Sequence, residues 1–276
     1  MNGSGTIGGY EDIHGNLRFW IARLLDAAGP GSRVIYDIGS NDGELTLPLC
    51  RPPSRVIAFE PVPASRERLE RRATDQGIMT GESRCLTVVP CALGSTAGSA
   101  TIEIYSDDTF SSFFGRPPED LQRYNLSVTG TVQVPVLALD ALTGLSGDRV
   151  RHEAQAMLPA EVALPLKPPD IVKIDVEGAE REVLTGAIET LRRFAPAVIM
   201  EYSCVNTENA GYPRENLMKL LNDAGYDHVY GLYRAEDRTL YHGTALESCR
   251  IWNVLAVPPR FSGAAAGAEI GTILPD

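Results

Sequence analysis

The chain has 276 residues, of which 43% are hydrophobic and 22% charged, so it can build one large globular α/β domain. Its 36 acidic and 25 basic residues give a net charge of −11, and no basic run compensates for it. Because nucleic-acid binding depends on lysine and arginine that neutralise phosphates, this charge argues against a nucleic-acid partner and against an anionic membrane surface.

No stretch approaches the ~18 consecutive apolar residues that a membrane-spanning helix needs. The N-terminus lacks the basic and apolar regions of a signal peptide. The five cysteines are odd in number and include no C-x-x-C pair, which argues against a disulfide framework or a zinc site. We therefore expect a cytoplasmic protein. The cysteines expected to be small buried hydrophobic residues are Cys50, Cys85, Cys91, Cys204 and Cys249.

The first predicted element is an amphipathic helix near the N-terminus. Residues 1–16 are rich in glycine and predict a flexible arm. Apolar residues from Leu17 to Ala28 then recur at helical spacing, and Gly29 ends the pattern. Residues 1–32 are thus predicted to form an arm followed by one helix.

Short apolar strands then alternate with helices. Strands are predicted at 34–38, 55–59, 85–93, 170–176 and 197–202, and helices at 64–76, 178–194 and 215–224. This alternation predicts a mostly parallel sheet with helices on both faces. Residues 227–257 predict antiparallel strands that complete the sheet. The domain is therefore expected to span 33–260, with 261–276 as a flexible tail.

Two regions interrupt the alternation. Residues 99–139 alternate with a period of two, which predicts a β-rich excursion after the third strand. Residues 143–169 contain scattered glycine and proline and one short helical pattern near 151–158. We interpret 143–169 as an insertion loop or lid.

A glycine-containing loop after the first strand carries the strongest chemical signal. It has the sequence Asp37-Ile38-Gly39-Ser40-Asn41-Asp42-Gly43, and the second strand ends at Glu60. Ligands of open α/β sheets bind beyond the carboxyl ends of such strands. Glu60 follows Gly39 by 21 residues, close to the spacing at which an acidic residue binds a ribose. The pattern predicts a nucleoside site.

The sequence of this loop also indicates which kind of nucleoside ligand the site binds. A dinucleotide fingerprint needs three glycines, of which the second lets the backbone approach the pyrophosphate. Asn41 occupies that second position here, and the third glycine is absent. S-adenosylmethionine fits better, with Asp37 facing its ammonium group and Glu60 its ribose. The alternatives are a nicotinamide-dependent oxidoreductase, a protein that binds the cofactor without catalysis, and a purely structural turn.

Further motifs follow this loop in a fixed order. They are Phe59-Glu60-Pro61, Cys91-Ala92-Leu93-Gly94, Ser111-Ser112, Val136-x-x-Leu139-Asp140, Lys173-Ile174-Asp175-Val176-Glu177-Gly178-x-Glu180, Val183-Leu184-x-Gly186 and Pro196-x-x-x-x-Glu201. Together with the loop they resemble the FkbM-type family of S-adenosylmethionine-dependent methyltransferases. The resemblance runs from about Val34 to Pro258 and is most specific at 173–178.

The resemblance implies a class I Rossmann-like methyltransferase fold, with seven strands in the order 3-2-1-4-5-7-6 and strand 7 antiparallel. It implies O-methylation of hydroxyls on sugars, polyketides and other small natural products. It also places Cys91 and Ala92 beside the adenine. The predicted cofactor contacts are Asp37, Gly39, Ser40, Asn41, Gly43, Glu60, Pro61, Cys91, Ala92 and Ser112.

The acceptor is expected over the ends of the fourth and fifth strands, because the strand order reverses between strands 1 and 4. Those ends carry Asp175, Glu177 and Glu201. A hydroxyl needs a base to share its proton, and we predict Glu201 or Glu177, with Asp175 touching the reacting atoms. Lys173 lies in a predicted buried strand, where its charge needs a partner. The expected partner is Asp175, Glu177 or Glu180. The resulting ion pair is either catalytic or purely structural.

Two further possibilities concern a metal and a histidine. The three carboxylates offer oxygen ligands for Mg²⁺, but no dense D-x-D cluster supports this, so no metal is predicted. His152 in the insertion is a less favoured base. The expected partner is a small-molecule hydroxyl acceptor, and the sequence does not fix the oligomeric state.

Overall fold

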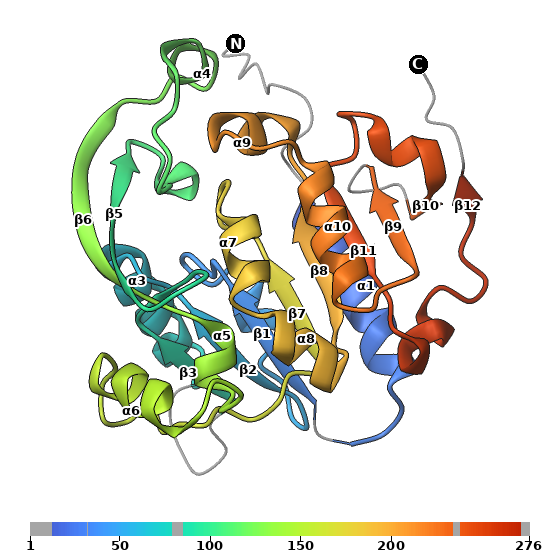
Figure 1. The fold of residues 1–276 in the computed structure, drawn as a ribbon, viewed down its shortest axis with the longest axis horizontal. Coiled ribbons are helices and arrows are strands. Elements are labelled where there is room, and N and C mark those ends of the chain that lie inside the picture. The colour runs from blue at the N-terminus through green and yellow to red at the C-terminus, as the bar shows by residue number, and fades with distance from the viewer. Residues whose placement is uncertain (1–12, 32, 79–84, 234–237, 272–276) are drawn as a thin grey trace.

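The computed structural model describes residues 13–31, 33–78, 85–233 and 238–271 (Figure 1). Within these residues the strands of the main sheet are β1 (Val34–Ile38), β2 (Arg55–Phe59), β3 (Leu86–Val89), β7 (Ile171–Ile174), β8 (Ala197–Glu201), β9 (Val229–Leu232), β10 (Leu240–Tyr241), β11 (Asn253–Ala256) and β12 (Ile270–Gly271). Their order across the sheet is β12-β10-β9-β11-β8-β7-β1-β2-β3.

This order confirms the predicted fold class. The run β3-β2-β1-β7-β8-β11-β9 is the expected 3-2-1-4-5-7-6, and β11 is antiparallel to both β8 and β9. The prediction of seven strands is wrong in number, because β10 adds to the sheet beside β9 and β12 adds beside β10. The predicted strand at 85–93 also divides, since β3 ends at Val89.

The helices are α1 (Ile13–Ala27), α2 (Thr46–Leu49), α3 (Pro63–Asp75), α4 (Pro118–Arg123), α5 (Leu139–Leu142), α6 (Asp148–Ala156), α7 (Glu180–Thr185), α8 (Ile188–Phe194), α9 (Cys204–Asn209) and α10 (Glu215–Asp223), with 3₁₀ turns η1 (Asp108–Phe110), η2 (Gly243–Glu247) and η3 (Pro259–Ala264). The predicted helix at 178–194 breaks at Gly186. A side chain at Gly186 would meet the backbone oxygen of Gly94 at 2.0 Å, so only glycine fits at this close contact between the two segments.

Helices cover both faces of the sheet, as predicted, and successive residues of a strand serve opposite faces. Tyr36 packs in one core cluster with Leu184 of α7 and Leu217 of α10, which lie in front of the sheet in Figure 1. Ile35 packs in a second cluster with Trp20 of α1 and residues of α3 and η3. The two clusters hold the strand ends in fixed positions.

A second, smaller sheet confirms the β-rich excursion. It consists of β4 (Ala92–Leu93), β5 (Gly98–Tyr105) and β6 (Val128–Leu137), in the order β4-β6-β5. Between β5 and β6 the chain folds back, so that the backbones of Glu103 and Ser112 exchange hydrogen bonds of 3.0 and 3.3 Å. This return places residues 108–116 over the carboxyl ends of the main sheet.

The segment 143–169 is part of the packed domain. Its Leu158, Val162 and Leu166 are buried in the same core cluster as β1. Tyr36 in β1 donates a hydrogen bond of 2.6 Å to the backbone oxygen of Lys167. Helix α6, to which His152 belongs, lies at the end of the sheet away from α9 (Figure 1), so of the two interpretations of 143–169 the lid is wrong and the segment is a packed insertion.

The C-terminal residues differ from the predicted flexible tail. Phe261 and Ala264 are each 1% exposed and pack on the face that α1 covers. Residues 261–271 therefore complete the core and the edge of the sheet. The predicted arm at 1–12 and the last residues, 272–276, lie outside the described residues. Every helix of the described ranges is too short or too polar to cross a bilayer.

Cys204 and Cys249 form a disulfide, which corrects the expectation that all five cysteines are free. Cys204 begins α9, and Cys249 follows η2, 45 residues further along the chain. No motif marks such a distant pair in the sequence. The other three cysteines are free and buried, as predicted.

Removal of this disulfide by the double substitution Cys204→Ser/Cys249→Ser is expected to lower the free energy of unfolding by about 4 kcal/mol, the chain-entropy value for a loop of this length. Urea unfolding of the oxidised wild type and of the double variant measures the difference. A thiol reductant should lower the wild-type midpoint and leave the variant unchanged. Equal midpoints for the oxidised and reduced wild type would contradict the disulfide.

Candidate functional site

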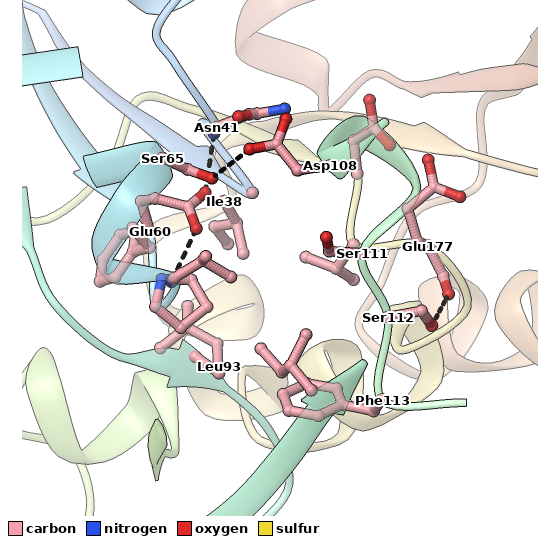
Figure 2. A pocket seen from close by; sticks show the side chains of 18 of the residues that line it. Ile38, Asn41, Glu60, Ser65, Leu93, Asp108, Ser111, Ser112, Phe113 and Glu177 are labelled. Atoms are coloured by element: carbon pink, nitrogen blue, oxygen red, sulfur yellow. Dashed lines mark hydrogen bonds between the residues drawn. The ribbon is translucent and has the colours of Figure 1, made fainter. Parts of the chain in front are cut away.

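A cavity lies beyond the carboxyl ends of β1 and β2, and the segment 108–113 closes its opposite side (Figure 2). The predicted site residues that line it are Gly39, Asn41, Glu60, Pro61, Cys91, Ala92, Ser112, Asp175 and Glu177. The structure therefore brings together most of the residues that were predicted to bind a cofactor. The predicted residues that do not line the cavity are Asp37, Ser40, Gly43, Lys173 and Glu201.

The loop after β1 is fixed in place by its glycine and by Glu60. Gly39 has a φ of 78°, and a Cβ there would lie 1.9 Å from the backbone oxygen of Asp175, so a larger residue does not fit. The backbone N–H groups of Asn41 and Val62 donate to the two carboxylate oxygens of Glu60, each at 2.8 Å. Glu60 is only 5% exposed, and burial raises its pKa to about 7. Its carboxylate is thus held at the cavity wall with lone pairs left for a ligand.

The lining chemistry fits S-adenosylmethionine. Leu93, Ile102 and Phe113 give apolar surface for a purine, and Glu60 gives acceptors for ribose hydroxyls. Among the described lining residues there is no lysine or arginine, the side chains that usually bind a pyrophosphate. Asp175 instead contributes a carboxylate, 32% exposed, which suits a cationic sulfonium group. These groups favour a nucleoside that carries a cation over a dinucleotide.

Replacing Glu60 by alanine is expected to weaken binding of S-adenosylmethionine by about 10- to 100-fold, because a hydrogen bond to a charged group contributes roughly 1.5–3 kcal/mol. Isothermal titration calorimetry measures this change. Glu67→Ala, which removes an exposed glutamate of α3, is the matched control and should bind like the wild type. Unchanged affinity in the Glu60→Ala variant would count against this position of the nucleoside.

Lys173 lies beneath the loop and is 4% exposed. Its Nζ donates to the backbone oxygen of Gly39 at 2.8 Å and lies 3.1 Å from Asp37 Oδ1 and 3.7 Å from Asp175 Oδ2. Burial lowers the pKa of Lys173, but the charges of Asp37 and Asp175 outweigh burial and leave the pKa above its ordinary value. Lys173 therefore ties the loop after β1 to the end of β7.

These contacts change the predicted roles of two residues. Of the three partners expected for Lys173, Asp175 is confirmed, whereas the lysine's described ion pairs do not include Glu177 or Glu180. Asp37 faces Lys173 because the two are paired in register across β1 and β7, which the sequence alone does not reveal. Asp37 is 1% exposed and also accepts a hydrogen bond from Thr46 Oγ1 at 2.5 Å. Its carboxylate thus faces the lysine and does not line the cavity, and its predicted contact with the cofactor's ammonium stays a prediction.

Three carboxylates meet beside the cavity, and we call Asp175, Glu177 and Glu201 the carboxylate cluster. One oxygen of each lies within 4.8 Å of the others. Arg116 forms an ion pair with Glu177. The Nδ2 atom of Asn206 donates to Glu177 Oε2 at 2.9 Å and to both oxygens of Glu201 at 3.0 Å. The sequence predicted the three acids but missed Arg116 and Asn206.

The two glutamates of the carboxylate cluster have pKa values above their ordinary value. Burial, and after it the charge of Asp175, raises the pKa of Glu177 to about 8, although Arg116 and Asn206 act to lower it. Burial and the neighbouring charges of Glu177 and Asp175 raise the pKa of Glu201 well above its ordinary value. A carboxylate whose pKa lies near the working pH is suited to accept a proton from a substrate.

The donors around the carboxylate cluster favour acid–base chemistry over metal binding. Hard divalent cations need several free carboxylate oxygens. Here Arg116 and Asn206 already direct N–H groups at Glu177 and Glu201. The prediction that the site needs no metal stays a prediction.

The two serines of the Ser111-Ser112 motif have different roles. Ser112 Oγ donates to the backbone oxygen of Glu177 at 2.6 Å and accepts from the N–H of Phe114 at 3.1 Å (Figure 2). It supports the turn in which Glu177 adopts a φ of 55°. Ser111 lines the same cavity, and its buried Oγ has no hydrogen-bond partner among the described residues. Ser112 also lines the cavity, and its predicted contact with the cofactor stays a prediction.

Comparison with known proteins finds a methyltransferase family model and methyltransferase relatives. The family model for the methyltransferase FkbM domain matches residues 37–227. The hexuronic acid methyltransferase AglP of Haloferax volcanii is 27% identical over 204 residues, which are 74% of this chain and 67% of that protein. The methyltransferase sdnD of Sordaria araneosa is 28% identical over 232 residues, which are 79% of this chain and 81% of that protein.

Solved structures are more distantly similar. The crystal structure of methyltransferase FkbM from Methylobacillus flagellatus is 16% identical with a TM-score of 0.44. The match covers 82% of this chain and 44% of the chain in the crystal.

Proposed function

Because the chain belongs to the FkbM methyltransferase family and is an S-adenosylmethionine-dependent methyltransferase, we propose that it methylates a hydroxyl group of a small natural product of the sugar or polyketide type. The observation that carries this proposal is the carboxylate cluster, whose Asp175 and Glu177 line the cofactor cavity. A hydroxyl acceptor needs a base, whereas a more nucleophilic acceptor does not.

Different residues of the site are proposed to bind the cofactor and to accept the proton. Bound S-adenosylmethionine supplies an electrophilic methyl group on its sulfonium. Glu60 holds the ribose, and Asp175 lies on the wall where the acceptor meets the methyl group. Glu201 would take the proton of the acceptor hydroxyl as the hydroxyl oxygen displaced the methyl carbon from the sulfonium sulfur, which would leave as the neutral thioether of S-adenosylhomocysteine. Alignment of the two reactants alone can contribute ~7–11 kcal/mol.

Glu201 is the better base of the two glutamates. Arg116 forms an ion pair with Glu177, and a guanidinium at hydrogen-bond distance makes a carboxylate a weaker base. Within the described residues no cation forms an ion pair with Glu201, and its hydrogen bonds come from the neutral amide of Asn206. Glu177 then keeps Arg116 in place, and Glu201 receives the proton.

The partner and the location are proposals with different degrees of support. The name of the AglP relative describes a methyltransferase that acts on a sugar acid, which supports a sugar-type acceptor. The charge of −11 supports a small-molecule acceptor over a nucleic acid or an anionic membrane. A cytoplasmic location stays a prediction, and the Cys204–Cys249 disulfide weighs against it, because disulfides persist mainly in oxidising compartments.

The proposal is tested by incubating the full chain with S-adenosylmethionine labelled on its methyl group and a panel of glycosides, polyketide alcohols and hexuronic acids. The expected product is a labelled methyl ether, identified by mass spectrometry. Label found only in esters or amines would contradict hydroxyl methylation. Tight cofactor binding without turnover of any acceptor would favour the non-catalytic alternative.

A further inference from the structure

Asn206 is buried beside the carboxylate cluster, at 7% exposure, on the short helix that follows β8. Ser203 caps this helix, and its Oγ accepts from the backbone N–H of Asn206 at 3.2 Å. The cap starts α9 immediately after the strand and places Asn206 in its first turn. From there its side chain contacts Glu201, the last residue of β8, and Glu177 across the sheet edge.

The hydrogen bonds of Asn206 fix which way its amide points. The Oδ1 atom accepts from Nη1 of Arg116 at 3.4 Å, so the oxygen faces the guanidinium. The Nδ2 atom has two hydrogens, and its three acceptors belong to Glu177 and Glu201. One hydrogen is therefore available for each glutamate. The reverse orientation would set the amide oxygen against two carboxylates.

We infer that Asn206 is a positioning residue of this methyltransferase: its amide holds Glu201 as an ionised acceptor beside Glu177 and thereby directs the acceptor's proton to Glu201. This inference rests on the proposed function. Asn206 touches neither the cofactor cavity nor the reacting atoms directly, and it acts through the glutamate that it contacts.

The surroundings of Glu201 explain why such a residue is needed. The charged groups that face this part of the site are Asp175, Glu177, Glu180 and Arg116. Three of these are acids, and burial of Glu201, followed by the charges of these acids, favours its protonated form. Asn206 offers Glu201 only N–H donors, which bind the ionised form. Without the amide, Glu201 would keep its proton to a higher pH and lose its base function near neutrality.

The test is the dependence of kcat on pH in variants of Asn206. Asn206→Ala should move the acidic limb of the profile upward by about one pH unit, so that kcat falls about tenfold at pH 7 and recovers in alkaline buffer. Asn206→Asp keeps the shape of the side chain, replaces the donor with an acceptor and should move the limb further. KM for the acceptor and affinity for S-adenosylmethionine should remain as in the wild type.

A control on the same helix distinguishes this role from a structural one. Asn209 also donates its side-chain amide to a carboxylate, that of Asp120 at 2.9 Å. Asn209→Ala should leave the pH profile unchanged. A fall in kcat by the same factor at every pH in Asn206→Ala, or an unchanged profile, would overturn the inference.

A second measurement does not depend on turnover. Carbon NMR of glutamate-labelled protein follows the titration of the Glu201 carboxyl, which is assigned by its loss in Glu201→Gln. A higher pKa in Asn206→Ala than in the wild type supports the inference even if no hydroxyl acceptor is methylated. Equal values would overturn it while leaving the proposed function intact.

Discussion

Replacing Glu201 by glutamine is expected to lower kcat by about 10²- to 10⁴-fold, the usual contribution of a positioned general base. Glutamine has nearly the same shape and still offers an acceptor to Asn206, but it does not take a proton. Affinity for S-adenosylmethionine should stay unchanged, because Glu201 does not line the cofactor cavity. Single-turnover methyl transfer and calorimetry measure the two quantities separately.

The matched variant Glu177→Gln identifies which glutamate is the base. Arg116 already forms an ion pair with Glu177. The substitution Glu177→Gln should therefore lower kcat less than Glu201→Gln does. A larger loss in Glu177→Gln would exchange the two roles. Wild-type rates in both variants would show that no glutamate of the carboxylate cluster takes the proton.

Replacing Lys173 by methionine is expected to lower the free energy of unfolding by about 3–5 kcal/mol, because loss of one partner leaves a buried charge unpaired. The charge left behind is that of Asp37, which is 1% exposed. The hydrogen bond to Gly39 is lost as well, so the loop after β1 loses its tie to β7. Urea unfolding monitored by circular dichroism measures the change.

Two further variants separate charge from packing at this position. Lys219→Met removes an exposed lysine of α10 and should leave stability within 0.5 kcal/mol or so of the wild type. Asp37→Asn combined with Lys173→Met removes both charges and should be more stable than Lys173→Met alone. If Lys173→Met unfolds like the wild type, the ion pair with Asp37 does not support the fold.

Much of the fold follows from the sequence because strands and helices alternate with clear periodicity. That pattern and the ordered motifs correctly predicted the main strands and their order. The sequence left open whether 227–257 holds two strands or three, and it did not reveal β12, since a two-residue strand carries no period. It also missed the burial of Phe261, because that residue packs on α1 at the other end of the chain.

In the candidate site, too, residues brought together by local structure were predictable from the sequence, whereas residues that reach the site from distant positions were not. Gly39, Asn41 and Glu60 were predictable because the geometry of one loop and one strand end brings them together. Arg116 and Asn206 reach Glu177 from 61 and 29 residues away, and no local pattern predicts such contacts. The one available signal was Ser203, a helix N-cap placed three residues before Asn206.

The most direct measurement is a crystal structure of this chain with S-adenosylhomocysteine. We expect both ribose hydroxyls to lie within hydrogen-bond distance of Glu60, with the adenine against Leu93 and the sulfur on the side of Asp175. A nucleoside bound outside this cavity, or one whose ribose does not contact Glu60, would contradict this expectation.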